Sequence, residues 1–172
     1  MAVAVYLRHS GQGAWAYYND DSSYACPYGK LYNWIAAVDS RQLCPTGWHV
    51  PSDAEWSTMI NFLDPTADGG NDFSNSNIAG VAMRSAGTEY WYSQDTIDVG
   101  TNSSGFSGLP GGARSHVLTS FDEMGFNGYW WSSSPGAETG TALGRVLSWY
   151  YSSPGLFIGT ISNGCSVRCL RD

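Results

Sequence analysis

The clearest structural signal in the sequence is the start of a helix just after residue 50. Ser52 can accept a hydrogen bond from the free amides of a first helical turn, and Glu55, three residues later, can bond back to Ser52. Apolar residues then recur at helical spacing, namely Trp56, Met59, Ile60 and Leu63. Pro65 ends the run, because a residue that precedes proline disfavours the helical conformation. The sequence therefore predicts a helix of about three turns over residues 52–63.

The rest of the chain favours short strands joined by turns. Five segments are aromatic or β-branched and are bounded by Gly, Pro, Ser or Asn: residues 29–34, 129–133, 145–150, 156–160 and 166–170. Only 13% of the residues are charged, whereas 15% are aromatic and 21 are glycines, a balance that argues against a helical bundle. We therefore expect an α+β fold.

A second, shorter helix is predicted over residues 77–85. Asn77 is its expected N-cap, and the residues expected to face the core are Ile78, Val81 and Ala82. The surrounding stretch, residues 64–115, is rich in Gly, Ser, Asn and Asp. It also contains large apolar side chains that would be poorly accommodated in water, namely Trp91, Tyr92, Phe106 and Leu109. We interpret this stretch as long ordered loops and not as a linker.

The charge balance excludes some classes of partner. Eight basic residues face fifteen acidic ones and give a net charge of -7, so no basic surface is available to neutralise phosphates, and we expect no nucleic-acid partner. Nowhere do eighteen apolar residues follow one another, so we expect no membrane insertion. Residues 1–6 lack the positive segment of a signal peptide. We expect one soluble domain that spans residues 1–172.

The four cysteines, Cys26, Cys44, Cys165 and Cys169, predict disulfides and not a metal site. None has the Cys-x-x-Cys spacing of zinc ribbons. If residues 165–169 form a strand, Cys165 and Cys169 lie roughly 13 Å apart, too far for a bond between them. Each would then need an early partner, either Cys26 or Cys44, in an oxidising compartment. The alternative is that some or all of them are buried free thiols.

Five stretches in order carry a resemblance to a known family. They are residues 29–37, 44–56, 105–114, 128–134 and 166–172, with words such as Gly-Lys-Leu-Tyr-Asn-Trp, Cys-Pro-Thr-Gly-Trp-His-Val-Pro-Ser and Gly-Tyr-Trp-Trp-Ser-Ser-Ser. Over roughly residues 15–172 the chain resembles the Fibrobacter succinogenes major paralogous domain family. The resemblance implies a C-type-lectin-like fold with two helices, short mixed or antiparallel strands, long ordered loops and adjacent chain ends. It also implies a Cys44–Cys169 disulfide, and because Cys26 and Cys165 depart from the family pattern together, we expect them to pair.

The resemblance also points to a function for residues 143–162. Some members of this family resemble the variable proteins of diversity-generating retroelements, in which adenine-directed mutagenesis rewrites the codons of one C-terminal window. Apart from Trp149, every residue type in this window can arise from an AAC codon by mutation of its adenines, which is compatible with such a history. Large rings interspersed with Ser, Gly and Thr are also the composition of antibody paratopes.

We therefore predict a ligand-binding display domain with a diversified C-terminal surface. The expected binding residues are Leu143, Gly144, Val146, Ser148, Trp149, Tyr150, Tyr151, Ser153, Gly155, Phe157, Gly159, Thr160 and Ile161. About half of the window should face the core, because strands alternate their faces. The expected partner is a protein or another surface ligand, and the expected location is extracellular, at a cell surface or on a virion.

Catalytic interpretations of other residues are weaker. Asp53 and Glu55 diverge on a helix, and capping explains Glu55. His49 has no nucleophile beside it, so we expect it only to form hydrogen bonds. Trp130 and Trp131 are expected to be structural, with one ring buried and the other near the binding face. The calcium-and-sugar triplets of true C-type lectins are missing, so we predict no metal. Since none of these residues forms a catalytic motif, we also predict no cofactor and no enzyme activity.

Two alternatives to the display domain stay open. One is an oxidoreductase like the formylglycine-generating enzymes, which have a related fold and use paired cysteines. A reactive Cys165 of low pKa would favour it, whereas an inert disulfide would count against it. The other is a fixed cell-surface adhesion module, whose window would be identical among sister copies.

Overall fold

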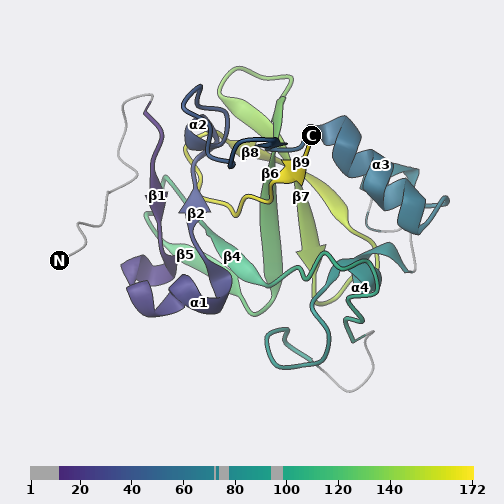
Figure 1. Cartoon of the computed structure of the whole chain (residues 1–172). Helices are drawn as coiled ribbons and strands as arrows, with labels where there is room; N and C mark the ends of the chain where they lie inside the picture. The colour runs from purple at the N-terminus through teal and green to yellow at the C-terminus, as the bar shows by residue number, and fades with distance from the viewer. Residues whose placement is uncertain (1–11, 72, 74–77, 94–98) are drawn as a thin grey trace.

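The computed structural model describes residues 12–71, 73, 78–93 and 99–172 (Figure 1). Its α-helices are α1 Ala25–Tyr28, α2 Trp34–Ala37, α3 Asp53–Leu63 and α4 Ala79–Met83. Its strands are β1 Trp15–Ala16, β2 Leu31–Tyr32, β3 Trp48–His49, β4 Gly111–Arg114, β5 Phe121–Met124, β6 Asn127–Pro135, β7 Thr141–Ser148, β8 Gly155–Thr160 and β9 Leu170–Arg171. Helices and strands follow one another without a regular alternation. The predicted α+β class is confirmed.

The central element is a five-stranded sheet with the strand order β5-β4-β6-β7-β8. The β4–β6 pair is parallel, and the other neighbours are antiparallel. β7 therefore lies inside the sheet, between β6 and β8. Two small sheets flank it: β1 pairs with β2, and β3 pairs with β9, so that the end of the described chain lies beside β3. In Figure 1 the small β1–β2 sheet and α3 lie on opposite sides of the long strands β6 and β7.

Helix α3 forms as the sequence predicts. Ser52 Oγ accepts from the Glu55 amide at 3.3 Å, and Glu55 Oε2 accepts from the Ser52 amide at 2.8 Å, which completes the capping box. Trp56 and Ile60 are buried in the core, and Met59 and Leu63 pack against it. The helix ends at Leu63, directly before Asp64-Pro65.

The core consists of two clusters on either side of the sheet. The first joins the sheet to α3 and α4 through Trp56, Ile60, Met83, Phe106, Trp130 and Leu147, among others. The second contains Val50, Trp131 and Cys165, with Tyr129 and Phe157 packed against it. Trp130 and Trp131 enter different clusters because successive side chains of a strand point to opposite faces. Both rings are buried, so the expectation that one of them borders a binding face is wrong.

The second helix is shorter than predicted and presents a different face to the core. Helix α4 covers Ala79–Met83, and it ends there because Arg84 is extended and the next amide, of Ser85, donates to the Gly108 carbonyl at 2.8 Å. Ala79 and Met83 are buried, whereas Ile78 is 55% exposed. The predicted N-cap, Asn77, lies outside the described residues.

Three of the predicted strands need correction. Of residues 29–34 only Leu31–Tyr32 form a strand, because the Asn33 side chain caps helix α2 by accepting from the Ala36 amide at 3.0 Å. β7 begins earlier than predicted, at Thr141, and ends at Ser148. Residues 166–170 do not form a continuous strand: Ser166 makes an isolated bridge to Trp130, and β9 begins only at Leu170. The predictions for 129–133 and 156–160 are confirmed within β6 and β8.

The long segment between α3 and β4 packs as predicted at two of its rings. Trp91 and Phe106 are buried, and the Trp91 indole donates to the Gly108 carbonyl at 3.1 Å. Tyr92 instead is exposed. The described part of the segment therefore packs on the core like an ordered loop.

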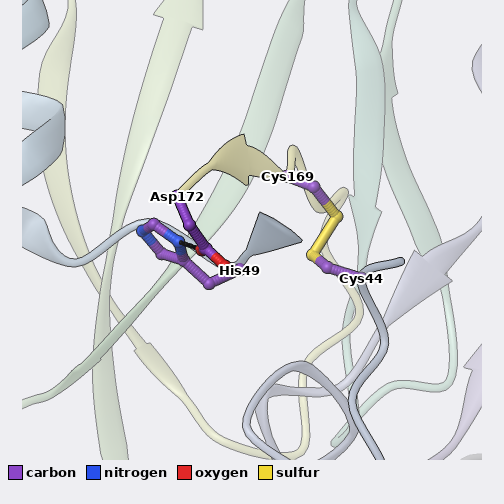
Figure 2. The surroundings of a disulfide bond; sticks show 4 residues. All are labelled: Cys44, His49, Cys169 and Asp172. Carbon is purple, nitrogen blue, oxygen red and sulfur yellow. Dashed lines mark hydrogen bonds and ion pairs between the residues drawn. A yellow bond between two sulfur atoms is a disulfide. The ribbon is translucent and has the colours of Figure 1, made fainter. Parts of the chain in front are cut away.

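One of the two expected disulfides is formed. Cys44 and Cys169 form a disulfide with a Cα–Cα distance of 5.8 Å, as implied (Figure 2). The expected Cys26–Cys165 pair is wrong: both thiols are free, with Cys26 exposed and Cys165 buried. The backbone of Cys165 exchanges two hydrogen bonds with Tyr32, at 2.7 and 2.9 Å, which holds its side chain in the second core cluster.

Candidate ligand-binding surface

The structure divides the predicted binding residues into buried and accessible ones. Because β7 is an inner strand and both faces of the sheet are covered, alternation does not turn half of it outward. A ligand on the molecular surface cannot reach the side chains of Val146, Ser148 and Ser153, which are buried. The neighbouring Arg145 and Leu147 are buried as well. Most of β7 is therefore scaffold. Across the whole window 143–162, nine of the twenty residues are buried, which confirms the expectation that about half of it faces the core.

The three glycines of the predicted site allow aromatic rings to approach the backbone. A Cβ atom on Gly144 would lie 2.3 Å from the Phe157 ring, one on Gly155 would lie 2.4 Å from Phe73, and one on Gly159 would lie 2.7 Å from Trp131. Real Cβ atoms do not come this close to other heavy atoms, so each position requires glycine for packing. These glycines act as packing positions, and all three are buried.

The accessible residues lie at two separate ends of the β7–β8 hairpin. Tyr150 and Tyr151, 57% and 44% exposed, occupy the turn between the strands. Thr160 is paired with Thr141 at the opposite end of the hairpin, and Ile158, exposed on β8, was not among the predicted residues. The half-buried residues are spread along the whole hairpin: Trp149 lies at the turn, Phe157 lies in the middle of β8, and Leu143 and Ile161 lie toward the far end. The window therefore does not form one continuous site.

The turn end carries a chain of contacting rings that we call the ring cluster: Phe73, Tyr92, Phe126, Trp149, Tyr150 and Tyr151. Ring centroids are 4.6 Å apart for Phe73 and Tyr151, and 5.1 Å apart for Tyr151 and Tyr150. Trp149 lies 5.5 Å from Tyr150 and 4.9 Å from Tyr92, and Tyr92 lies 4.9 Å from Phe126. These separations are typical of favourable aromatic pairs.

The ring cluster combines apolar area with polar atoms at the surface. Tyr92, Phe126, Tyr150 and Tyr151 are exposed, while Trp149 and Phe73 are half-buried beneath and between them. Contiguous exposed apolar patches are one kind of surface that marks binding sites in proteins. Tyrosine rings offer large contact area with few rotatable bonds, and their hydroxyls donate and accept hydrogen bonds.

Buried polar contacts hold the backbone beneath these rings. Arg84, which is buried, donates from Nη1 to the carbonyls of Ser148 and Trp149 at 2.8 and 3.1 Å. The Trp149 amide donates to the Phe126 carbonyl at 2.8 Å, and the Tyr92 amide donates to the Gly125 carbonyl at 2.7 Å. The loops that carry three of the rings are therefore tied to one another and to β7, and the backbone beneath the ring cluster is held in place.

The second half of the turn is anchored to helix α4. The Gly80 amide donates to the Ser152 carbonyl at 2.7 Å, and a Cβ on Gly80 would lie 2.5 Å from that oxygen. Glycine at position 80 therefore lets the helix approach the turn. The Phe73 ring lies against Gly155, at the start of β8, and so supports Tyr151 from the other side.

Three members of the ring cluster were not among the binding residues predicted from the sequence. Tyr92 was expected to pack inward, and neither Phe73 nor Phe126 was considered. A usable signal existed only for Phe126, an aromatic residue within the turn-forming run Gly125-Phe126-Asn127. The other two reach the site through loops whose paths no local pattern predicts.

His49 is part of a polar cluster elsewhere in the fold. Its Nε2 lies 3.0 Å from Glu55 Oε1, and its Nδ1 lies 2.6 Å from Asp172 Oδ1 (Figure 2). The hydrogen bonds to Asp172 and then to Glu55 raise the pKa of His49 above its usual range. These contacts connect β3 to α3 and to the residue after β9, which fits the predicted hydrogen-bonding role.

Metal and membrane sites find no support in the described part of the chain. Within it, no three His, Cys, Asp or Glu side chains gather closely enough to hold a metal ion. None of the helices formed by the described residues is long and apolar enough to cross a membrane.

The fold and the surface together define an α+β protein with a ring cluster, held by buried polar contacts, at one end of its main sheet. Comparison with known proteins adds the family. The model of the Fibrobacter succinogenes major domain matches residues 4–171, so the chain belongs to that family. No curated protein and no solved structure matches the chain.

Proposed function

We propose that this protein is a ligand-binding display domain of C-type-lectin-like fold, and that its ring cluster binds a protein partner. The observation that carries the proposal is the combination of exposed rings with a fixed backbone: Tyr150 and Tyr151 reach solvent, while Arg84 and Gly80 hold the main chain beneath them. Rigid aromatic groups on a preorganised support bind partners with little loss of conformational entropy.

The proposal includes diversification of the window in the manner of a retroelement variable protein. Its physical basis is the separation of packing residues from accessible ones. Tyr150, Tyr151 and Thr160 are exposed and can change without loss of core contacts, whereas the buried Arg145 and Leu147 cannot. Such a protein would display its surface outside the cell or on a virion, where the Cys44–Cys169 disulfide persists.

An oxidoreductase function receives less support. A catalytic cysteine needs an accessible thiolate, but Cys165 is buried and desolvation raises its pKa well above that of a free thiol. Cys26, its expected disulfide partner, is exposed and not bonded to it. We therefore propose binding without catalysis.

A display library tests the proposed binding surface without knowledge of the natural ligand. Tyr92, Tyr150 and Tyr151, whose rings are exposed, are randomised together, and the library is selected against hen egg-white lysozyme as a model protein. We expect folded binders whose melting temperatures stay within about 5 °C of the parent, since surface substitutions change stability little. A matched library at Val146, Leu147 and Ser153, which are buried, should lose the fold. Unfolding of the first library, or selection that yields no binder from it, would contradict the proposal.

Gene sequence distinguishes the display domain from a fixed adhesion module. The display domain predicts a nearby template copy of the codons for residues 143–162 that differs from the gene only at adenines. Among sister copies, substitutions should concentrate at the accessible positions and spare Arg145, Leu147 and Ser153. An adhesion module predicts identical windows and no template.

A further inference from the structure

A second candidate site lies away from the ring cluster, between α3 and the C-terminal segment. It is a hollow of about 230 Å³ that opens to solvent. Its walls come from α3, from the loop at residues 104–106 and from residues 168–170; they include Trp56, Met59, Phe106, Arg168 and Leu170. Neither the ring cluster nor the window 143–162 contributes to it.

The hollow has apolar walls and one cation. The Arg168 guanidinium stands 4.8 Å from the centroid of the Phe106 ring. Among the described residues, no ion pair joins this guanidinium to a carboxylate. Glu55 is the one acidic side chain among the described residues that line the hollow, and its carboxylate already accepts from Ser52 and contacts His49. Although Arg168 as a whole is exposed, desolvation lowers the pKa of its guanidinium.

Trp56 also lines the hollow, as part of α3. It is only 2% exposed, and its indole Nε1 is buried, so a ligand in the hollow contacts the indole ring and not the N–H group. The centroid of this ring lies 5.5 Å from that of Phe106, so the two rings form adjoining parts of the apolar wall.

The C-terminal wall is fixed in place before any ligand arrives. Cys169, which lines the hollow, is bonded to Cys44 (Figure 2), and β9 pairs with β3 directly after it. The Asp172 amide also donates to the Gly47 carbonyl at 3.1 Å. Because Arg168 directly precedes this tied segment, its place beside α3 is held by the fold.

We propose that the hollow binds a small organic carboxylate with an apolar body. The carboxylate oxygens accept from the Arg168 guanidinium, and the apolar body lies among Met59, Phe106 and Leu170. A carboxylate fits better than a neutral acceptor because it also supplies the counter-charge that Arg168 lacks. An organic cation does not fit, since the open charge of the wall is positive.

The first experiment titrates the protein with 4-phenylbutyrate and follows the indole signals in ¹H–¹⁵N spectra. We expect a saturable shift of the Trp56 indole signal at millimolar concentrations, with the signals of Trp15 and Trp48 unchanged. The neutral analogue 4-phenylbutyramide should bind at least about tenfold more weakly, because it lacks the charge. Equal binding of the amide, or a Trp56 signal that does not respond, overturns the proposal.

Charge variants test the role of Arg168. Arg168→Gln should weaken 4-phenylbutyrate binding about tenfold, whereas Arg171→Gln, a matched change on β9 outside the hollow, should leave it unchanged. Should Arg168→Gln fail to fold, Leu170→Glu places a repelling charge at an exposed position of the rim and should weaken binding similarly, with Leu118→Glu as its control. Unchanged binding in a folded rim variant or in folded Arg168→Gln contradicts the proposed site.

The ring cluster provides an independent control. The Tyr150→Ser variant should retain 4-phenylbutyrate binding, because no ring of the cluster lines the hollow. Loss of binding in this variant would place the carboxylate at the ring cluster and not in the hollow. Failure of the carboxylate site leaves the proposed display function untouched, and the reverse also holds.

Discussion

Arg145 and Asp53 form an ion pair in which Arg145 Nη2 lies 2.9 Å from Asp53 Oδ1. The pair joins the inner strand β7 to the first turn of α3. Arg145 is completely buried, and desolvation lowers the pKa of its guanidinium. The neighbouring Asp53 offsets this lowering only in part. Its Nη2 also lies 3.0 Å from Ser57 Oγ, but Nε and Nη1 have no hydrogen-bond partner in the described part of the chain. Asp53 is thus the one carboxylate paired with this cation among the described residues.

Asp53→Ala should therefore destabilise the protein strongly. Removal of one partner leaves a buried charge uncompensated, which costs about 3–5 kcal/mol. Urea unfolding at neutral pH measures the change. Glu138→Ala, at an exposed acid without an ion pair in the described structure, is the matched control and should change stability by less than about 0.5 kcal/mol. A small effect of Asp53→Ala would show that water or another group replaces the carboxylate.

A structural feature could be predicted from the sequence where the residues that cause it lie close together in the chain. Helix α3 was predictable because its capping box and apolar stripe lie within a dozen consecutive residues. The burial of β7 was not, because it results from distant partners: α3 covers one face through Asp53, and Phe157 packs onto the backbone of Gly144 at the other. A period of two predicts which residues share a face, but not whether that face is covered.

The candidate site was predictable to a similar extent. Trp149, Tyr150 and Tyr151 are consecutive and lie next to turn-forming residues, so their composition indicated a surface. Phe73, Tyr92 and Phe126 join them only through loop paths that depend on long-range contacts such as those of Arg84. Resemblance supplied the Cys44–Cys169 disulfide, but it led to a wrong pairing for Cys26 and Cys165.

Substitution at the exposed positions of the ring cluster should separate binding from stability. In a variant selected for lysozyme, replacement of the residues selected at positions 150 and 151 by serine should abolish binding, because truncation of an interface hot spot costs about 2 kcal/mol or more. The melting temperature of this double variant should fall by only a few degrees, since both positions are exposed. Phe62→Ser, at an exposed ring on α3, is the control and should keep binding. Equal affinity of the double variant would remove the ring cluster from the proposed interface.

Phe157→Ser should behave differently, although Phe157 belongs to the same window. Its ring centroid lies 5.3 Å from those of both Tyr129 and Trp131, within the second core cluster. Truncation of a buried phenylalanine costs about 3–5 kcal/mol, and partial exposure reduces this to about 2–4 kcal/mol. At about 2–4 °C per kcal/mol, calorimetry should show a fall in melting temperature of roughly 4–16 °C. A change as small as that of Tyr150→Ser would indicate that the ring is peripheral.

The Cys44–Cys169 disulfide should be a major source of stability. It closes a loop across a sequence separation of 125 residues, and loss of such a bond costs about 2–5 kcal/mol through the greater freedom of the unfolded chain. The double variant Cys44→Ser with Cys169→Ser should lower the free energy of unfolding by that amount, which is measured as a lower urea midpoint. Cys26→Ser, at an exposed free thiol, should leave it unchanged. The urea midpoint of the intact protein should also fall when a reductant is added, and no response to it would mean that the bond contributes little.

The hydrogen bonds of His49 predict a pH dependence of stability. Its folded pKa is raised above the unfolded value of about 6.5 by Asp172 and Glu55. A raised pKa means that the folded state binds the proton more tightly, so the contribution is fully present below the unfolded pKa and is lost as the pH rises through the folded pKa. Unfolding curves measured between about pH 5 and 8 should therefore show a loss of stability across this window that the His49→Gln variant lacks. The His116→Gln variant, whose imidazole contacts Asn163 and no carboxylate in the described structure, should retain the wild-type loss. If His49→Gln followed the same pH profile as the wild type, another group would have to carry the linkage, and the contacts of His49 with Asp172 and Glu55 would contribute nothing to folding.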